Sequence, residues 1–251
     1  MRYLIRCLIS FSILLVFTTL VFGETNHHVT YEINGESYAG YYVPADKDSP
    51  FILLIHDWDG LTDYEIKRTH MLSELGYSVF AADLFGAGIR PTTIEDKRQL
   101  TGELYKDREK IRKLIYGALQ EAKARGANIK NGVAMGYCFG GTAVLELARS
   151  GADLKGFVTF HGGLATPEGQ DYSKTKGEVL ILHGTADSAI PMKEFAALAK
   201  ELESAGVRHE MITYGGADHA FTVFGGGRYN ENADKKSWQR FIKFLEDKFE
   251  K

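Results

Sequence analysis

The sequence is poor in cysteine. Among its 251 residues only Cys7 and Cys138 are cysteines, and Cys7 lies in an apolar N-terminal stretch. If that stretch is removed from the mature chain, Cys138 has no partner, and no disulfide within the chain can form. A lone thiol is either buried and inert or retained because it reacts, so the surrounding sequence has to decide between the two.

The sequence also lacks an excess of charge of one sign and the spacing of a metal site. Its formal net charge is -3, without a long block of like charges, so nothing favours binding to nucleic acid or to an anionic membrane. The eight histidines show no His-x-x-x-His pair, and no metal is expected. We therefore expect a small-molecule partner, no nucleic-acid partner and no cofactor.

Long apolar runs are equally scarce: the only one extends from Leu8 to Val21, follows two arginines and ends near Gly23. This layout is typical of a secretory signal peptide, residues 1–23, with the mature chain beginning at Glu24. The alternative is a retained membrane anchor, but a membrane-spanning helix needs about 20 apolar residues. We expect an exported protein, periplasmic or secreted, with no stable membrane association after cleavage.

Residues 24–251 predict a single domain, because no linker rich in proline or serine divides them. The Asn34-Gly35 pair predicts an N-terminal β-hairpin. Apolar runs typical of strands buried on both faces of a parallel sheet follow at 51–56, 78–82, 132–135, 156–160, 179–182 and 210–214. Helical spacing separates them at 66–75, along one long amphipathic face from 100 to 122, and at 142–148, 195–202 and 238–249. This alternation predicts an α/β fold with a doubly wound, mostly parallel sheet.

The segment Gly136-Tyr137-Cys138-Phe139-Gly140-Gly141 lies between an expected strand and an expected helix. Such a turn holds a nucleophile in a strained conformation, and its glycines remove Cβ atoms that would collide. The nearby helix N-terminus favours a thiolate. The pattern therefore predicts a nucleophile elbow with Cys138 in the usual serine position. The alternative is a structural glycine-rich turn around a buried thiol.

Two later segments supply the partners that such a nucleophile needs. Asp187 follows the run 179–182, and His219 follows the run 210–214. Nucleophile, acid and base in this chain order are typical of the α/β-hydrolase fold, in which the acid orients the imidazole. Asp187 alone is also compatible with a surface turn. Together the three residues predict a Cys138–Asp187–His219 triad.

These motifs resemble the dienelactone hydrolase family over nearly the whole mature chain. The matching segments are 136–141, Phe-His-Gly at 160–162, His-Gly-x-x-Asp at 183–187 and Asp-His-Ala-Phe at 218–221. The resemblance implies a compact α/β-hydrolase fold without a large lid, and hydrolysis through a thiol.

The resemblance also implies an oxyanion hole formed by the backbone N–H groups of Trp58 and Phe139, and a contact of Asp57 with the resting thiol. The founding enzymes have glutamate where this chain has Asp57, which is one methylene shorter. The alternative for Asp57 is a loop residue that bonds to nearby backbone.

The residues that would contact the substrate depart from the family. The founding enzymes hold a substrate carboxylate with arginines, one of them at the position of Val223 here. Arg90 lies near the position of the other. We therefore expect Phe85, Phe221 and Val223 to line an apolar cleft that prefers neutral substrates, unless Arg90 reaches the site.

The most specific reading is thus a carboxylic ester or lactone hydrolase that works through an acyl-thioester on Cys138 and an oxyanion hole. Two alternatives remain open at this point. A catalytically silent binding protein can use the same fold, since fold does not fix function. An acyltransferase would use an alcohol in place of water.

Overall fold

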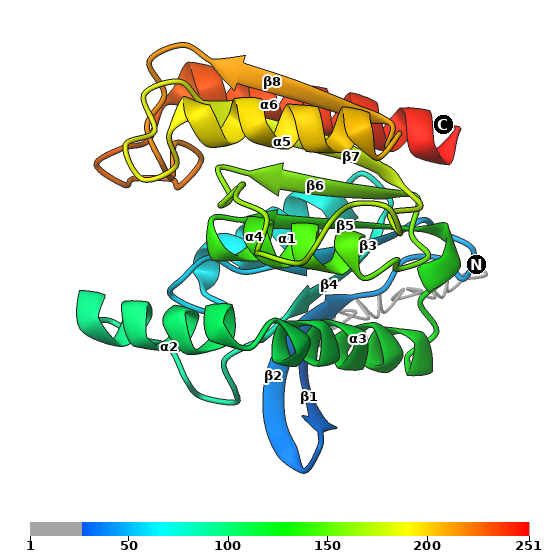
Figure 1. The fold of residues 1–251 in the computed structure, drawn as a ribbon. Coiled ribbons are helices and arrows are strands. Elements are labelled where there is room, and N and C mark those ends of the chain that lie inside the picture. The colour runs from blue at the N-terminus through cyan, green and yellow to red at the C-terminus, as the bar shows by residue number, and fades with distance from the viewer. Residues whose placement is uncertain (1–26, 251) are drawn as a thin grey trace, which may run out of the picture.

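The structure is a computed structural model that describes residues 27–250, so the expected signal peptide lies outside the described residues. Its centre is one eight-stranded sheet in the order β1-β2-β4-β3-β5-β6-β7-β8 (Figure 1). The strands are β1 (His28–Ile33), β2 (Glu36–Val43), β3 (Phe51–Ile55), β4 (Ser78–Ala82), β5 (Gly132–Tyr137), β6 (Gly156–Phe160), β7 (Glu178–Gly184) and β8 (His209–Tyr214).

The expected topology is confirmed. β1 and β2 pair antiparallel around Asn34 and Gly35, whose φ angles of 54° and 82° are those of a tight hairpin turn. β2 pairs antiparallel with β4, and all remaining neighbours are parallel. All residues of β3, β4, β5 and β6 are buried, which explains why these strands appear in the sequence as continuous apolar runs.

Helices cover both faces of the sheet. α1 (Asp63–Ser73) and α6 (Glu231–Phe249) share one apolar core with one face, and α3 (Arg108–Ala124), α4 (Phe139–Arg149) and α5 (Met192–Ser204) share another core with the opposite face. A short 3-10 turn at Ile129–Asn131 precedes β5. Within residues 27–250 we find no helix that combines the length and apolarity needed to cross a membrane.

The prediction of one long helix over 100–122 is wrong, because the structure has two helices there. α2 (Ile94–Lys106) ends and α3 begins at Asp107, whose side chain accepts a hydrogen bond from the Lys110 N–H at 2.9 Å. A carboxylate that caps an N-terminus satisfies backbone donors, so it favours starting a new helix there. α2 consequently departs from the line of α3 and projects from the body (Figure 1).

The carboxyl ends of the parallel strands lie at one edge of the sheet, where ligands bind in open α/β folds. The segments that directly follow β3, β5, β7 and β8 carry Asp57, Cys138, Asp187 and His219, respectively. The topology therefore brings together four side chains that are far apart in the sequence.

Candidate active site

Cys138 lies in the sharp turn between β5 and α4 with φ 50° and ψ −110°, a conformation that non-glycine residues rarely adopt. The turn is possible only because neighbouring side chains are absent. A Cβ atom on Gly136 would overlap the backbone of Gly140, and one on Gly140 would overlap the carbonyl oxygen of Ile55. The glycine spacing seen in the sequence thus has the steric cause expected of a nucleophile elbow.

The structure brings Cys138, His219 and Asp187 together. Nε2 of His219 lies 3.1 Å from the Cys138 sulfur, and Nδ1 lies 2.8 Å from Oδ2 of Asp187. These distances form one continuous chain from sulfur through imidazole to carboxylate. The arrangement can transfer a proton from the thiol to Nε2 while the carboxylate orients the ring.

Asp187 is held by more than the imidazole. Its Oδ1 accepts hydrogen bonds from the N–H groups of Ala189 at 2.9 Å and Ile190 at 2.8 Å. Burial by itself would raise the pKa of Asp187, but the hydrogen bond and charge interaction with His219 and the bond from Ile190 outweigh burial, and the pKa is lowered. The carboxylate is therefore ionised at neutral pH and stabilises a charged imidazolium.

The carboxylate of Asp57 faces the thiol and also accepts a hydrogen bond from the backbone N–H of Trp58. The sequence left open whether Asp57 contacts the thiol or the nearby backbone, and in the structure its carboxylate makes both contacts. Burial, reinforced by the nearby charge of Asp59, raises the pKa of Asp57 to about 6. Burial and the Asp57 charge raise the pKa of the Cys138 thiol, which is therefore mostly protonated in this resting arrangement.

Of the two amides expected to form the oxyanion hole, one contacts the thiol and the other contacts Asp57. The Phe139 N–H donates to the sulfur, and the Trp58 N–H points to the Asp57 carboxylate. The Trp58 donor is thus already occupied. A substrate oxygen can use this amide only after the Asp57 carboxylate has moved aside.

Glu65 fixes the loop that carries Asp57 and Trp58. One oxygen of Glu65 accepts from the Asp57 N–H at 3.3 Å, and the other accepts from the Thr62 N–H at 2.8 Å as part of the capping box of α1. Burial raises the pKa of Glu65 to about 7. Two buried carboxyl groups with raised pKa values therefore lie on one side of the thiol, a concentration typical of functional sites.

A cavity of about 330 Å³ opens onto the triad. Its wall includes the aromatic rings of Trp58 and Tyr105 and the side chain of Ile190. Two exposed arginines, Arg98 from α2 and Arg228 from the loop before α6, also line it. Within residues 27–250 neither guanidinium lies within ion-pair distance of a carboxylate, so both are available to an anion at the cavity.

The structure corrects the expected substrate contacts. Phe221 is fully buried, with its ring 5.4 Å from that of His161, and does not reach the cavity. Phe85 packs 4.6 Å from the ring of His56, beneath the elbow rather than in the cavity wall. Phe221 turns inward because an aromatic ring is more stable in the core than at a wet surface. Phe85 is half-buried and lines a separate hollow of about 400 Å³.

Arg90 and Val223 are also displaced from the expected positions. Arg90 donates to the carbonyl oxygens of Leu61 at 2.5 Å and Ile89 at 2.6 Å, so it holds its own loop and is absent from the cavity wall. Val223 lines an adjoining hollow of about 220 Å³, which shares Trp58 and Arg228 with the catalytic cavity.

Sequence reasoning missed Arg98, Tyr105 and Arg228. Arg98 and Tyr105 reach the cavity because α2 departs from the direction of α3. The apolar periodicity of the sequence continues through both helices and predicts one helix instead. Arg228 follows three glycines, 225–227, which gave no periodic signal. The only signal in the sequence for Arg228 is the Gly-Gly-Gly-Arg segment itself, which lies nine residues or fewer after His219, the predicted base.

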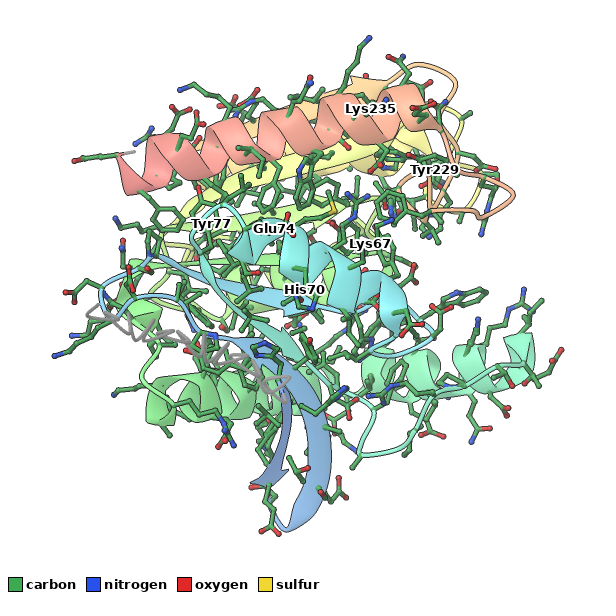
Figure 2. All side chains as sticks on the ribbon, turned by 180° about the vertical axis from the view of Figure 1, so that it is seen from behind. Lys67, His70, Glu74, Tyr77, Tyr229 and Lys235 are labelled. Atoms are coloured by element: carbon green, nitrogen blue, oxygen red, sulfur yellow. The ribbon has the colours of Figure 1, made fainter. Side chains whose placement is uncertain are left out.

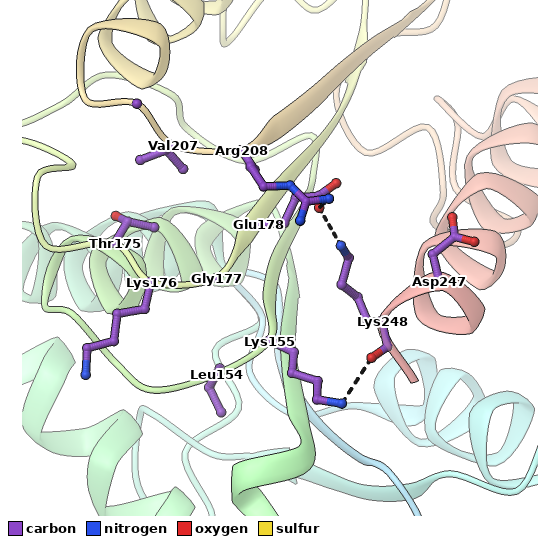
Figure 3. A pocket seen from close by; sticks show the side chains of 11 residues that line it. Leu154, Lys155, Thr175, Lys176, Gly177, Glu178, Val207, Arg208, Asp247 and Lys248 are labelled. Carbon is purple, nitrogen blue, oxygen red and sulfur yellow. Dashed lines mark hydrogen bonds and ion pairs between the residues drawn. The ribbon is translucent and has the colours of Figure 1, made fainter. Parts of the chain in front are cut away.

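A larger cavity of about 480 Å³ lies at the opposite edge of the sheet (Figure 3). Lys248 and Arg208 share the carboxylate of Glu178 there, and Lys155 donates to the carbonyl oxygen of Lys248 at 3.1 Å. None of the triad residues lines it. Of these two cavities, the one at the triad is the candidate active site although it is smaller, because only its wall includes groups arranged to react. In the described part of the chain no cluster of three or more His, Cys, Asp or Glu residues is arranged to hold a metal.

Comparison with known proteins agrees with this geometry. The model of the dienelactone hydrolase family matches residues 38–249. A carboxymethylenebutenolidase homolog of Homo sapiens is 28% identical over 198 residues, covering 76% of this chain and 78% of that protein. The solved structure named m3DLH is 30% identical with a TM-score of 0.82, covering 88% of this chain and 97% of its own. A dienelactone hydrolase-like promiscuous phosphotriesterase from metagenomic libraries is 28% identical with a TM-score of 0.80, covering 88% and 96%.

Proposed function

The chain belongs to the dienelactone hydrolase family and is a carboxylic ester or lactone hydrolase, and on this premise we propose that Cys138 is its nucleophile. The observation that carries the proposal is the 3.1 Å distance between the Cys138 sulfur and Nε2 of His219, whose Nδ1 lies 2.8 Å from Asp187. A thiol, a base and an orienting acid in hydrogen-bonding reach are the parts that covalent catalysis needs.

The first half-reaction forms an acyl-thioester. His219 takes the thiol proton at Nε2, the sulfur forms a bond to the carbonyl carbon, and the carbonyl electron pair moves to oxygen. The N–H groups of Trp58 and Phe139 stabilise this oxyanion. When the carbonyl re-forms, the carbon–oxygen bond to the alcohol breaks, and the alcohol oxygen takes the proton from His219.

The second half-reaction releases the acid. Water loses a proton to His219, attacks the thioester carbon, and forms a second oxyanion in the same hole. The carbon–sulfur bond then breaks, the sulfur recovers the proton, and the enzyme returns to its starting state. Neither half-reaction uses a metal or an organic cofactor.

Substrate binding has to displace the Asp57 carboxylate from the Trp58 N–H. The incoming carbonyl oxygen would otherwise lie against a negative charge, which is unfavourable in a cavity of low dielectric constant. Once Asp57 has moved, the charge interaction that raises the pKa of Cys138 weakens. The substrate itself would thereby favour the thiolate.

Arg98 and Arg228 support a substrate that carries a carboxylate. The expectation of a neutral substrate depended on Val223 and on the position of Arg90, neither of which lines the catalytic cavity. Arg98 and Arg228 come from different elements and reach the same cavity without carboxylate partners among residues 27–250. A planar guanidinium recognises a carboxylate through two parallel hydrogen bonds.

The test combines covalent labelling with turnover. A chloromethyl ketone should alkylate the protein once per chain, at Cys138, with loss of chloride, and Cys138→Ala should lose both labelling and ester hydrolysis. Added alcohols should not divert the product into new esters, which separates a hydrolase from an acyltransferase. Full turnover by Cys138→Ala would overturn the mechanism, and labelling without turnover of any ester or lactone would favour a silent binding protein.

Export belongs to the same proposal and is supported by the sequence of residues 1–23 alone. N-terminal sequencing of the protein recovered from fractionated cells tests it. A chain that begins at Glu24 outside the cytoplasm is the expected result. A mature protein that retains Leu8–Val21 would overturn this part of the proposal.

A further inference from the structure

The loop between β8 and α6 carries His219, yet its composition favours no single conformation. Five glycines lie within residues 215–227, and three of them are consecutive. Glycine allows backbone conformations that other residues avoid, so such a loop loses much entropy when it is ordered. His219 nevertheless has to keep distances of 3.1 Å and 2.8 Å to its two partners. Something outside the triad has to hold the loop.

Thr222, three residues after His219, is the point at which the loop enters the core. Its side chain is fully buried, and Oγ1 lies 2.8 Å from Nε2 of His161 and 2.7 Å from the hydroxyl of Tyr64. The carbonyl oxygen of Thr222 accepts a hydrogen bond from Arg68 at 3.0 Å. One residue of the loop is thus bonded to three residues of two other elements: His161 in the segment after β6, and Tyr64 and Arg68 in successive turns of α1.

Arg68 is itself fixed by a buried ion pair. Only 1% of its surface is exposed, and its guanidinium lies 2.5 Å from the carboxylate of Asp234 in the first turn of α6. The rings of Tyr64, Tyr137, Phe224 and Trp238 surround the guanidinium within 6 Å. Figure 2 shows α1 and α6 side by side on this face, with Tyr229 at the end of the loop beside the start of α6. A buried pair of this kind contributes little net stability, so positional specificity is the better explanation for it.

His161 connects this cluster to the catalytic imidazole. Its ring is fully buried and lies 5.3 Å from the ring of His219 in an edge-to-face arrangement. Burial and the neighbouring His219 hold the pKa of His161 well below its ordinary value. His161 therefore stays neutral and does not compete with His219 for the thiol proton, which leaves it a packing and hydrogen-bonding role.

We propose that Thr222 is a positioning residue that fixes His219 against Cys138 through its contacts with His161, Tyr64 and Arg68. The inference rests on the proposed function, since it assigns a task only if His219 is the base. If Thr222 is released, the glycine-rich loop can move by a fraction of an ångström. A displacement of about 1 Å at a catalytic group costs up to about a hundredfold in rate.

The experiment replaces the Thr222 hydroxyl without changing its shape. Thr222→Val should lower kcat for a small ester by about ten- to hundredfold with KM nearly unchanged, because the substrate does not touch this residue. Thr222→Ser, which keeps the hydroxyl, should recover most of the loss. Thr175→Val is the matched control, since it removes a threonine hydroxyl that is also hydrogen-bonded, here as a donor to the carbonyl oxygen of Ala148 at 3.1 Å, at a position that does not line the cavity at the triad.

The outcomes separate the possible explanations. Parental kcat in a folded Thr222→Val protein would overturn the inference, even if its melting temperature falls. If Thr222→Val does not fold, Tyr64→Phe tests the inference in its place, because it removes only the contacts of the Tyr64 hydroxyl with Thr222 and Arg68. A parental kcat in Tyr64→Phe would likewise overturn the inference. Cys138→Ala is measured in parallel: an active Cys138→Ala protein refutes the proposed function, whereas an inactive one beside a fully active Thr222→Val refutes only the positioning role.

Discussion

The carboxylate of Asp57 is hydrogen-bonded to the backbone N–H of Trp58, the residue that directly follows it. The same carboxylate faces the Cys138 thiol and raises its pKa. One side chain therefore occupies the backbone N–H of Trp58 and favours the protonated form of the Cys138 thiol.

Asp57→Asn should make the thiol more reactive. The negative charge of Asp57 disfavours the thiolate and adds to the effect of burial, so its removal lowers the pKa of Cys138. Each unit by which this pKa falls gives about tenfold more thiolate at pH 7. The second-order rate constant for alkylation by iodoacetamide, measured from pH 6 to 10, should begin to rise at a lower pH in the variant than in the parent. Asp59→Asn is the control and should change the profile less; an unchanged profile in Asp57→Asn would contradict the assignment.

Cys138→Ser should retain only a small part of the esterase activity. The hydroxyl of serine is a much weaker acid than a thiol, and the nearby Asp57 charge opposes its ionisation further. We expect kcat to fall by at least about a thousandfold, a loss typical of removing one member of a triad. Steady-state hydrolysis of a chromogenic acetate ester measures this. Comparable rates in the two proteins would show that the site does not depend on a thiolate.

Arg98→Gln and Arg228→Gln should each impair hydrolysis of a carboxylated ester more than that of its neutral analogue. A charge-assisted hydrogen bond contributes about 1.5–3 kcal/mol, and exposure reduces this, so we expect about a tenfold loss in kcat/KM for the anionic substrate. Arg125→Gln is the matched control, because this arginine pairs with Glu121 on α3 and does not line the cavity. If the parent protein prefers the neutral ester and neither variant alters that preference, the substrate is neutral and the expectation based on Val223 was correct.

Glu65→Gln should change how the free energy of unfolding depends on pH. Burial raises the pKa of Glu65 from 4.5 to about 7 in the folded protein, so the folded state binds its proton more tightly than the unfolded state. The stability that comes from this proton is fully present below about pH 4.5 and is lost as pH rises through about 7. Glutamine cannot ionise, and its one amide oxygen can keep the capping-box bond from the Thr62 N–H, whereas the bond from the Asp57 N–H is lost at both pH values. Urea unfolding at pH 5 and pH 8 measures the free energy of unfolding of both proteins. From pH 5 to pH 8, this free energy should rise in the variant relative to the parent by up to the order of 3 kcal/mol. An equal difference at both values would place the pKa of Glu65 near its ordinary value.

The parts of the site that could be predicted are those set by short-range sterics. The glycines at 136 and 140 are required by the turn at Cys138, since a Cβ atom there would overlap backbone atoms. Cys138, Asp187 and His219 each follow a strand of the parallel part of the sheet, and the carboxyl ends of parallel strands meet at one edge, although β8 before His219 is a half-exposed edge strand rather than the buried one that the sequence predicted. Residues close in sequence to a strand end can therefore be placed at the site without knowing the packing.

The tertiary structure alone decided the residues around that centre. Asp107 stops one helix and starts the next, which turns α2 so that Arg98 reaches the cavity, whereas periodicity by itself continues through this position. Phe221 turns into the core, and Thr222 bonds to three residues that lie 61 to 158 positions away in the sequence. The sequence determined the mostly parallel sheet with its N-terminal hairpin and the glycine spacing around Cys138, and it predicted the triad, because local sterics and strand polarity govern these features, whereas the order of the strands came from the structure. The substrate contacts and the support of His219 arise from packing between distant segments, which no local pattern encodes.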